Sequence, residues 1–302
     1  MPTLGVVINT KNAAQTLART LESVNFADQI VVMDMESQDD TLKIAKRYTT
    51  QIFQAPDFGY VEPARVLALS KITADWTLVV DADEEIPQTL RRYIEAVVAG
   101  TAGQSDTVVA YKFPRQNIML GKWLEHTGWW PDYVLRLFKT GKVDWPSQIH
   151  AQPQVDGQVY TLPPNQEWAI VHHAYQSISQ FVDRVNRYTT IQAQEQSPDS
   201  PLISPLSSLF HELFRRLFLF EGFSDGKRGV ILSILQSLSE AVKQSKIIEN
   251  TNLLDEPISS EEISKQIKEI VSELQYWQAD FQIHRTSGLA QLWWRLRRKY
   301  RL

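Results

Sequence analysis

The first third of the chain alternates short apolar runs with amphipathic stretches. Three apolar runs have the length of a strand: residues 4–8, 30–33 and 76–80. Helical spacing or composition follows each of them, in residues 17–24, 41–48 and 87–100. This alternation predicts an α/β fold, with a mostly parallel sheet that carries helices on both faces.

Polar clusters follow each of the three apolar runs, at residues 9–12, 34–40 and 81–85. In a parallel sheet these positions are the carboxyl ends of neighbouring strands. Ligands of such sheets bind beyond those ends. The pattern therefore predicts one shared site built from all three clusters.

The rest of the chain changes character twice. Residues 107–175 are rich in β-branched and aromatic residues, which favours mixed or antiparallel strands. A proline-rich break at Pro198, Pro201 and Pro205 precedes helical patterns at residues 206–220, 229–242 and 260–281. We expect one domain over residues 1–196, with a first half to about residue 105 and a second half from 106, and then a helical region over 197–302.

Composition excludes several classes of protein. The net charge of −4 argues against duplex nucleic acid as the main partner. The chain has no cysteine, which excludes disulfides and cysteine-ligated zinc. Its first residues read as a strand and not as a signal peptide, and no run of about 18 apolar residues predicts a membrane span. These features favour a cytoplasmic protein.

Two carboxylates, Asp81 and Asp83, follow the apolar run at residues 76–80. In extended chain, side chains two residues apart lean to the same side. Paired carboxylates suit Mg²⁺ or Mn²⁺, which also bind diphosphate oxygens. The alternative is a solvated turn whose acids favour the start of the next helix.

Several ordered motifs resemble glycosyltransferase family 2, and in particular its lipopolysaccharide-core glucosyltransferase-like branch. Residues 6–12, 30–34 and 75–84 are similar to the opening and the metal-binding strand end of that family. Later similarities lie at residues 128–132, 135–138, 149–150, 173–175 and 188–189. The resemblance implies a GT-A fold and a metal-dependent inverting enzyme of cell-envelope polysaccharide biosynthesis. Its substrates would be a nucleotide sugar, with a UDP-sugar favoured, and a glycan or lipid-linked acceptor.

Carried over position by position, the resemblance assigns the donor site. Asp83 would be the direct metal ligand, and Asp81 would hold nucleotide or metal. The residues around the donor would be Asn9, Lys11, Asp34 and Arg65. Their alternative roles are ordinary ones: turn caps for Asn9 and Asp34, and surface ion pairs for Lys11 and Arg65.

On the acceptor side, Asp132 matches the acidic residue that the family places before a Leu-X-X-Arg-Leu-like stretch. It is our candidate for the base that takes the proton of the acceptor hydroxyl. A helix cap is the alternative role for Asp132. Arg136 either orients a carboxylate or phosphate or forms a structural ion pair. His150 is a structural residue or a ligand of metal or diphosphate.

The pattern also departs from the family. Met35 replaces a residue that is often polar, Ala151 replaces a common glutamate, and Val66 replaces a common asparagine. These changes keep a non-catalytic nucleotide-sugar-binding module open as an alternative. An Asp-X-Asp phosphatase is a second alternative, although its motif would follow the first strand.

The last stretch, residues 289–302, combines aromatic with basic residues. Such a segment suits an anionic membrane surface, and a lipid-linked acceptor would lie there. The alternatives are a helix packed on the domain and a mobile tail. The protein is therefore either purely cytoplasmic or bound peripherally to the inner face of the membrane.

Overall fold

The computed structural model describes residues 1–148, 152–196, 204–251 and 253–301. These residues form two compact units, one of residues 1–123 and 130–174, the other of residues 124–129 and 175–302. The domain boundaries expected from the sequence, near 105 and 196, stay predictions. Among the described residues, no helix is long and apolar enough to span a membrane.

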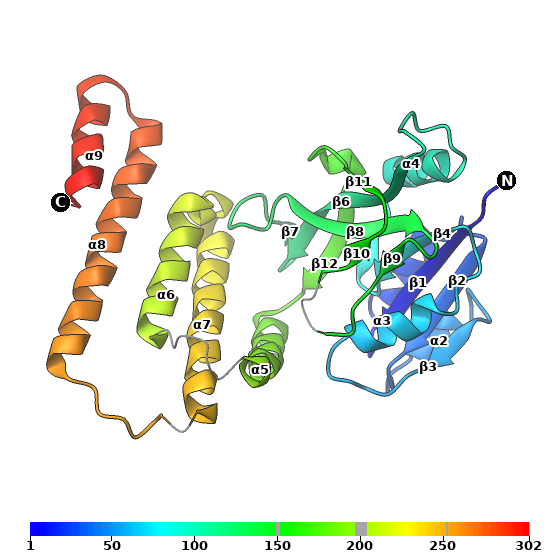
Figure 1. The fold of residues 1–302 in the computed structure, drawn as a ribbon, viewed down its shortest axis with the longest axis horizontal. Helices are drawn as coiled ribbons and strands as arrows, with labels where there is room; N and C mark the ends of the chain where they lie inside the picture. Colours follow the sequence, from blue (N-terminus) through cyan, green and yellow to red (C-terminus); the bar gives the residue numbers. More distant parts are fainter. Residues whose placement is uncertain (149–151, 197–203, 252, 302) are drawn as a thin grey trace. The chain divides into compact units, whose positions relative to one another are not determined.

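The first unit begins with four parallel strands connected through helices (Figure 1). The strands are β1 Leu4–Thr10, β2 Gln29–Asp34, β3 Ile52–Gln54 and β4 Trp76–Asp81. The helices are α1 Leu17–Ser23, α2 Thr41–Ala45, α3 Glu62–Leu69 and α4 Gln88–Val98. The sequence pattern did not predict β3 and α3, which are short.

The second half of the sheet is mixed. Its strands are β5 Glu84–Glu85, β6 Val108–Met119, β7 Lys122–Trp123, β8 Asp132–Lys139, β11 Gln158–Thr161 and β12 Ile170–Tyr175. Two further strands, β9 Val143–Asp144 and β10 Gln154–Val155, form a separate two-stranded sheet, and the 3-10 turn η1 Gln166–Trp168 precedes β12. Along the sheet the order is β3-β2-β1-β4-β8-β6-β12-β5, and β8 runs antiparallel to both β4 and β6. The predicted fold class is confirmed: a mixed α/β sheet, parallel in its first half.

Two hydrophobic clusters cover the parallel strands, one on each face. Val6 and Ile8 of β1 join the cluster that contains α1 and α4, whereas Val7 joins the cluster that contains α3. This alternation follows from the period of two along a strand. Each fully buried Val, Leu or Ile contributes about 1.5–3 kcal/mol. The apolar layers hold the strand ends, and with them the polar residues that follow, in fixed positions.

The second unit is helical, as predicted for the C-terminal region. Its elements are α5 Ile178–Glu195, α6 Pro205–Phe214, the π-helix η2 Arg215–Leu219, the 3-10 turn η3 Gly222–Asp225, α7 Gly226–Asn250, α8 Ser260–Arg285 and α9 Gly288–Tyr300. Ser259 and Glu262 form a capping box that starts α8. Asp225 accepts hydrogen bonds from the backbone of Glu125 and His126, so η3 fastens segment 124–129 to this unit.

Candidate active site

The carboxyl ends of the parallel strands bring three predicted residues side by side. In the β1–β4 pair, Asn9 lies opposite Asp81. In the β1–β2 pair, Thr10 lies opposite Asp34. The polar clusters therefore meet at one edge of the sheet, as expected from the position of each cluster after its strand.

Buried polar atoms without partners line the ends of β1 and β2. Asp34 is fully buried, and Asn9 and Thr10 are nearly so. Within the described chain, no hydrogen-bond partner faces either amide atom of Asn9, the Thr10 hydroxyl or Oδ1 of Asp34. Each such buried group costs about 1–3 kcal/mol, so a cluster of them calls for an explanation. A polar ligand that supplies the missing partners is such an explanation.

Lys11 follows β1 and pairs with Asp57. About a third of each of these side chains is exposed. Lys11 thus lies in a surface ion pair at the rim of the strand ends, beside the buried Asn9 and Thr10.

Asp81 ends β4 between two guanidinium groups. Arg65, from α3, donates from Nη2 to Oδ1 over 2.7 Å, and Arg136, from β8, pairs with Oδ2. Arg65 also lies 5.0 Å above the ring of Trp145. Burial would raise the pKa of Asp81, but Arg136 and Arg65 outweigh it and hold this pKa well below its usual range. Asp81 is therefore ionised and held in place.

Glu84, fully buried, continues this ion pairing. Its Oε1 accepts from Arg136 Nη2 over 2.6 Å and from Arg115 Nη1 over 3.2 Å. Its Oε2 accepts the backbone N–H of Asp81 over 3.0 Å. One buried carboxylate thereby fixes two arginines and the backbone at the end of β4.

Asp132, at the start of β8, receives three hydrogen bonds. Arg115 donates from Nε over 2.8 Å, its Nη2 lies at 2.7 Å, and Asn117 Nδ2 donates over 3.0 Å. All of these contacts go to Oδ2, so Oδ1 faces no donor among the described residues. Burial would raise the pKa of Asp132, but Arg115 and the Asn117 hydrogen bond outweigh it and lower this pKa.

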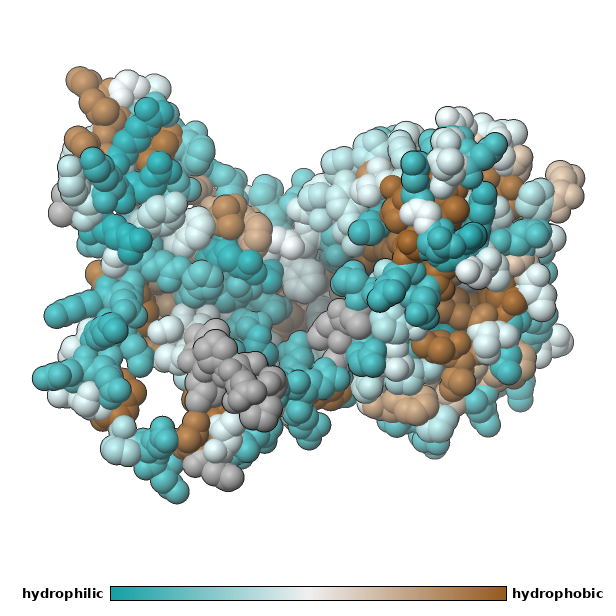
Figure 2. Space-filling view, in the orientation of Figure 1, coloured by the Kyte–Doolittle hydropathy of each residue, from teal (hydrophilic) through white to brown (hydrophobic). Residues whose placement is uncertain are grey.

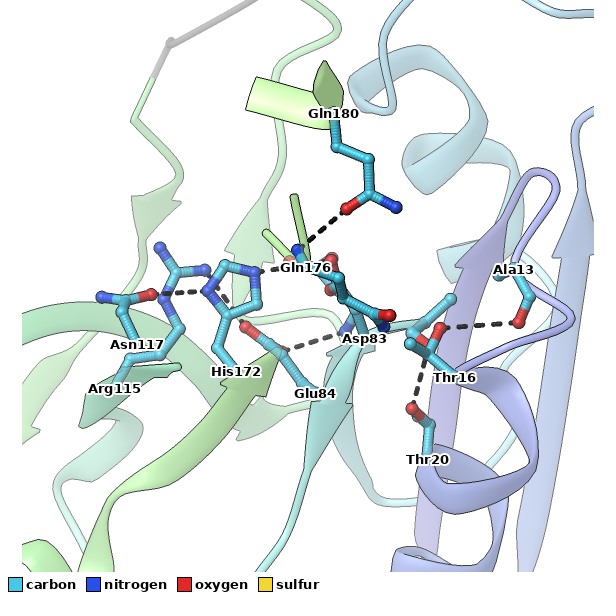
Figure 3. A network of polar contacts seen from close by, with 12 residues as sticks. Ala13, Thr16, Thr20, Asp83, Glu84, Arg115, Asn117, His172, Gln176 and Gln180 are labelled. Atoms are coloured by element: carbon cyan, nitrogen blue, oxygen red, sulfur yellow. Dashed lines mark hydrogen bonds and ion pairs between the residues drawn. The ribbon is translucent and has the colours of Figure 1, made fainter. Parts of the chain in front are cut away.

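Asn117 also fixes which ring nitrogen of His172, on β12, carries the proton. Because its amide nitrogen donates to Asp132, its Oδ1 faces His172 Nδ1, at 2.6 Å (Figure 3). Nδ1 must then carry the proton, an assignment that rests on the hydrogen-bond network. The other ring nitrogen, Nε2, lies 3.5 Å from Oδ2 of Asp83. In the neutral ring, Nε2 offers a lone pair beside that carboxylate.

His172 and His173 point to opposite sides of β12, as neighbours in a strand must. His173 Nε2 lies 2.9 Å from Arg19 Nη1 and 3.5 Å from Glu85. Its backbone N–H donates to the carbonyl of Asp83 over 2.9 Å. Only His172 belongs to the network around Asp132, and β12 fixes the backbone at Asp83.

The network follows the order of the strands. It runs from Asp81 on β4 through Arg136 on β8 and Arg115 and Asn117 on β6 to His172 on β12. It connects the predicted residues Arg65, Asp81, Asp83 and Asp132. The sequence analysis did not single out Glu84, Arg115, Asn117 or His172 as site residues. One signal was available: Arg115 and Asn117 are two positions apart in the region predicted to form strands, so their side chains share one face.

A divalent cation would find different surroundings at the two predicted ligands. Both oxygens of Asp81 face guanidinium groups, so a cation there would have to displace one of them. Asp83 offers a hard carboxylate oxygen, which suits Mg²⁺ or Mn²⁺, and Nε2 of His172 offers an imidazole nitrogen, which suits transition-metal ions better than Mg²⁺. Within the described residues, no group of three or more His, Asp or Glu side chains is arranged to hold a metal. A cation at Asp83 would therefore need further ligands beyond these two side chains. His150 lies outside the described residues.

The chain is similar to proteins described as glycosyltransferases. Residues 5–151 match the model of a family described as "Glycosyl transferase family 2". The chain is similar to "uncharacterized glycosyltransferase RP128" of Rickettsia prowazekii, with 28% identity over 82% of this chain and 87% of that protein. It is also similar to the "lipopolysaccharide core biosynthesis glycosyltransferase LpsC" of Rhizobium meliloti, with 24% identity over 61% of this chain and 68% of that protein.

Among solved structures, the chain is similar to residues 1–349 of S. aureus TarS. The TM-score is 0.39 and the identity 16%, over 82% of this chain and 88% of that one. The region that matches the family model contains Asp81, Asp83 and Asp132, whereas most of the helical unit lies outside it.

Proposed function

We propose that this glycosyltransferase, whose residues 5–151 match the model of glycosyl transferase family 2, is a metal-dependent inverting enzyme. Its donor is a nucleotide sugar, with a UDP-sugar favoured. Its acceptor is a glycan or a lipid-linked glycan. The similarity to a protein named for lipopolysaccharide core biosynthesis supports an acceptor of the cell envelope.

The observation that supports this proposal most is the contrast at the strand ends. Among the described residues, Asn9, Thr10 and Asp34 present buried polar atoms without partners, next to an ionised Asp81 held by two arginines. A base and ribose supply donors and acceptors for the first group. Arg65 adds a buried Nε without a partner among the described residues, which suits a phosphate oxygen.

Asp83 and His172 are the residues that would hold a divalent cation. Bound there, it would neutralise the charge of the departing nucleoside diphosphate. Asn117 fixes His172 so that Nε2 is turned to Asp83. In this assignment Asp81 keeps Arg65 and Arg136 in place, and a metal role for Asp81 itself stays a prediction.

Asp132 is the base in this mechanism. The acceptor hydroxyl oxygen attacks the anomeric carbon, the bond from that carbon to the diphosphate oxygen breaks, and the diphosphate leaves with the electron pair. Oδ1 of Asp132 takes the hydroxyl proton, while Arg115 and Asn117 hold Oδ2. Because its pKa is lowered, Asp132 accepts the proton late, when the attacking oxygen has already bonded and become acidic.

The test is a screen of nucleotide sugars for hydrolysis with Mn²⁺, Mg²⁺ or no metal. We expect metal-dependent hydrolysis of a UDP-sugar, and a loss of about a thousandfold in Asp83→Ala, since a Lewis-acid metal is worth several kcal/mol. Asp144→Ala, an exposed carboxylate of the same unit, is the matched control.

Three outcomes separate the alternatives. Hydrolysis that needs metal and Asp83 supports the transferase. Binding of a nucleotide sugar without turnover, in the presence of candidate acceptors, favours a binding module. A folded protein that binds no nucleotide sugar refutes the donor site.

A further inference from the structure

The C-terminal helix α9 packs on α8 through its polar side. Gln291 donates to the carbonyl of Ile283 over 3.0 Å, and Arg301, directly after the helix, donates to Ser272 Oγ over 2.9 Å. Arg298 pairs with Asp280 of α8. An amphipathic helix normally turns its apolar side to the protein. Here the contacts with α8 occupy the opposite side.

The apolar side of α9 consequently lies open. Five large side chains recur at spacings of three and four residues, which places them on one stripe: Leu289, Leu292, Trp293, Leu296 and Tyr300. Leu289 is 86% exposed, and the least exposed of them, Leu296, is still 48% exposed. Figure 2 shows brown apolar atoms beside teal polar atoms at the α9 corner of the view. Within the described residues, nothing covers this stripe.

Cations border the stripe on both sides. At 100° per residue, Arg295 and Lys299 follow one edge, and Arg297 follows the other. The guanidinium of Arg297 lies 4.8 Å above the ring of Trp293, and Lys299 Nζ lies 5.3 Å from the ring of Tyr300. The helix has no acidic residue, although the whole chain carries a net charge of −4. Its charge is therefore concentrated where the apolar stripe is exposed.

We propose that α9 lies flat on an anionic lipid bilayer, with the apolar stripe at the boundary of headgroups and acyl chains. Tryptophan and tyrosine favour that depth, and cations on the edges meet anionic headgroups while their stems stay apolar. At 1.5 Å per residue, α9 is about 20 Å long, too short to cross a hydrocarbon core of about 30 Å. A second copy of the helix is a poor partner, because its edges carry the same positive charge.

The experiment is sedimentation of the full chain with vesicles, without any nucleotide sugar. Vesicles of phosphatidylcholine with phosphatidylglycerol are compared with phosphatidylcholine alone, at low and high salt. We expect binding to the anionic vesicles that weakens with salt. Each cation near such a surface contributes roughly fivefold, so the double variant Arg295→Gln/Lys299→Gln should lower the partition coefficient roughly 30-fold.

A second variant, Leu292→Ser/Leu296→Ser, removes apolar area and leaves every charge in place; it should abolish most of the binding. The matched control is Ile267→Ser/Val271→Ser on α8, two exposed apolar residues outside α9. Equal loss in this control, or equal binding to neutral vesicles, would overturn the proposal in favour of general apolar adhesion. Loss of self-association in the α9 variants, measured by light scattering, would overturn it in favour of a second copy. Metal-dependent donor hydrolysis should persist in all of these variants, so failure here is distinct from failure of the proposed transferase activity.

Discussion

Buried polar groups differ in hydrogen bonding between the two halves of the site at the strand ends. At the ends of β1 and β2, Asn9, Thr10 and Asp34 keep atoms without partners in the described chain. Around β4, β8 and β6, the buried carboxylate of Glu84 is saturated by Arg136, Arg115 and the backbone. Both halves lie at comparable depth, so burial alone does not explain the difference.

This contrast separates two tasks that buried polar groups perform. A carboxylate whose two oxygens are both paired, such as that of Glu84, is fixed before any ligand arrives, which suits a group that holds Arg115 beside the base Asp132. An unsaturated group costs stability until a ligand pairs with it, which suits a nucleotide pocket. We infer that the residues at the ends of β1 and β2 bind the nucleotide. The residues on β4, β8 and β6 position the base Asp132.

The largest expected effect is that of Arg136→Met on the free energy of unfolding. It leaves Asp81 and Glu84 without their shared partner, and removing one member of a buried ion pair costs about 3–5 kcal/mol in the free energy of unfolding. Urea denaturation measures it. Lys142→Met, which removes an exposed pair with Asp156, should cost less than about 1 kcal/mol. Equal costs would mean that the network is no more than surface charge.

The next change, Asp34→Asn, addresses the unsaturated half. We expect weaker binding of UDP by roughly 10- to 100-fold, because hydrogen bonds to a charged group contribute about 1.5–3 kcal/mol. The free energy of unfolding should change by less than about 1 kcal/mol, since Oδ1 has no partner to lose. Calorimetric titration with UDP and Mn²⁺ measures the first, and urea denaturation the second.

Asp40→Asn, an exposed residue in the segment after β2, is the control for Asp34→Asn. It should leave both quantities unchanged. A large loss in the free energy of unfolding in Asp34→Asn, with UDP binding unchanged, would contradict a ligand-binding role for the ends of β1 and β2.

The smallest expected effect is on the pH dependence of stability. The pKa of Asp132 is lower in the folded protein than in the unfolded chain, so its contribution is present above the ordinary aspartate pKa of about 3.9 and is lost as the pH falls through the folded value. Asp132→Asn should make the decline below pH 4 less steep, by at most about 1.4 kcal/mol per pH unit. Thermal melts between pH 2.5 and 6 test this, with Asp144→Asn as the exposed control. An unchanged slope would show that Arg115 does not stabilise the ionised form.

The sequence by itself determined the local features. Apolar runs predicted β1, β2 and β4, and the acidic turn after residue 80 placed Asp81 and Asp83 at a strand end. The helical pattern at residues 260–281 likewise predicted α8. Each of these depends on neighbours within a few positions of the chain, which is the range over which periodicity and capping act. The sequence pattern did not predict β3, which has three residues, or α3.

Only the tertiary structure decided which distant side chains meet. Arg136 and Asp81 are 55 positions apart, and so are His172 and Asn117. They are brought together by the strand order β4-β8-β6-β12, which the packing of the whole sheet selects. The same packing left both amide atoms of Asn9 and Oδ1 of Asp34 without a hydrogen-bond partner among the described residues. A pattern along the chain records which residues are apolar and which are polar, whereas the pairing of buried charges depends on contacts that no short stretch contains.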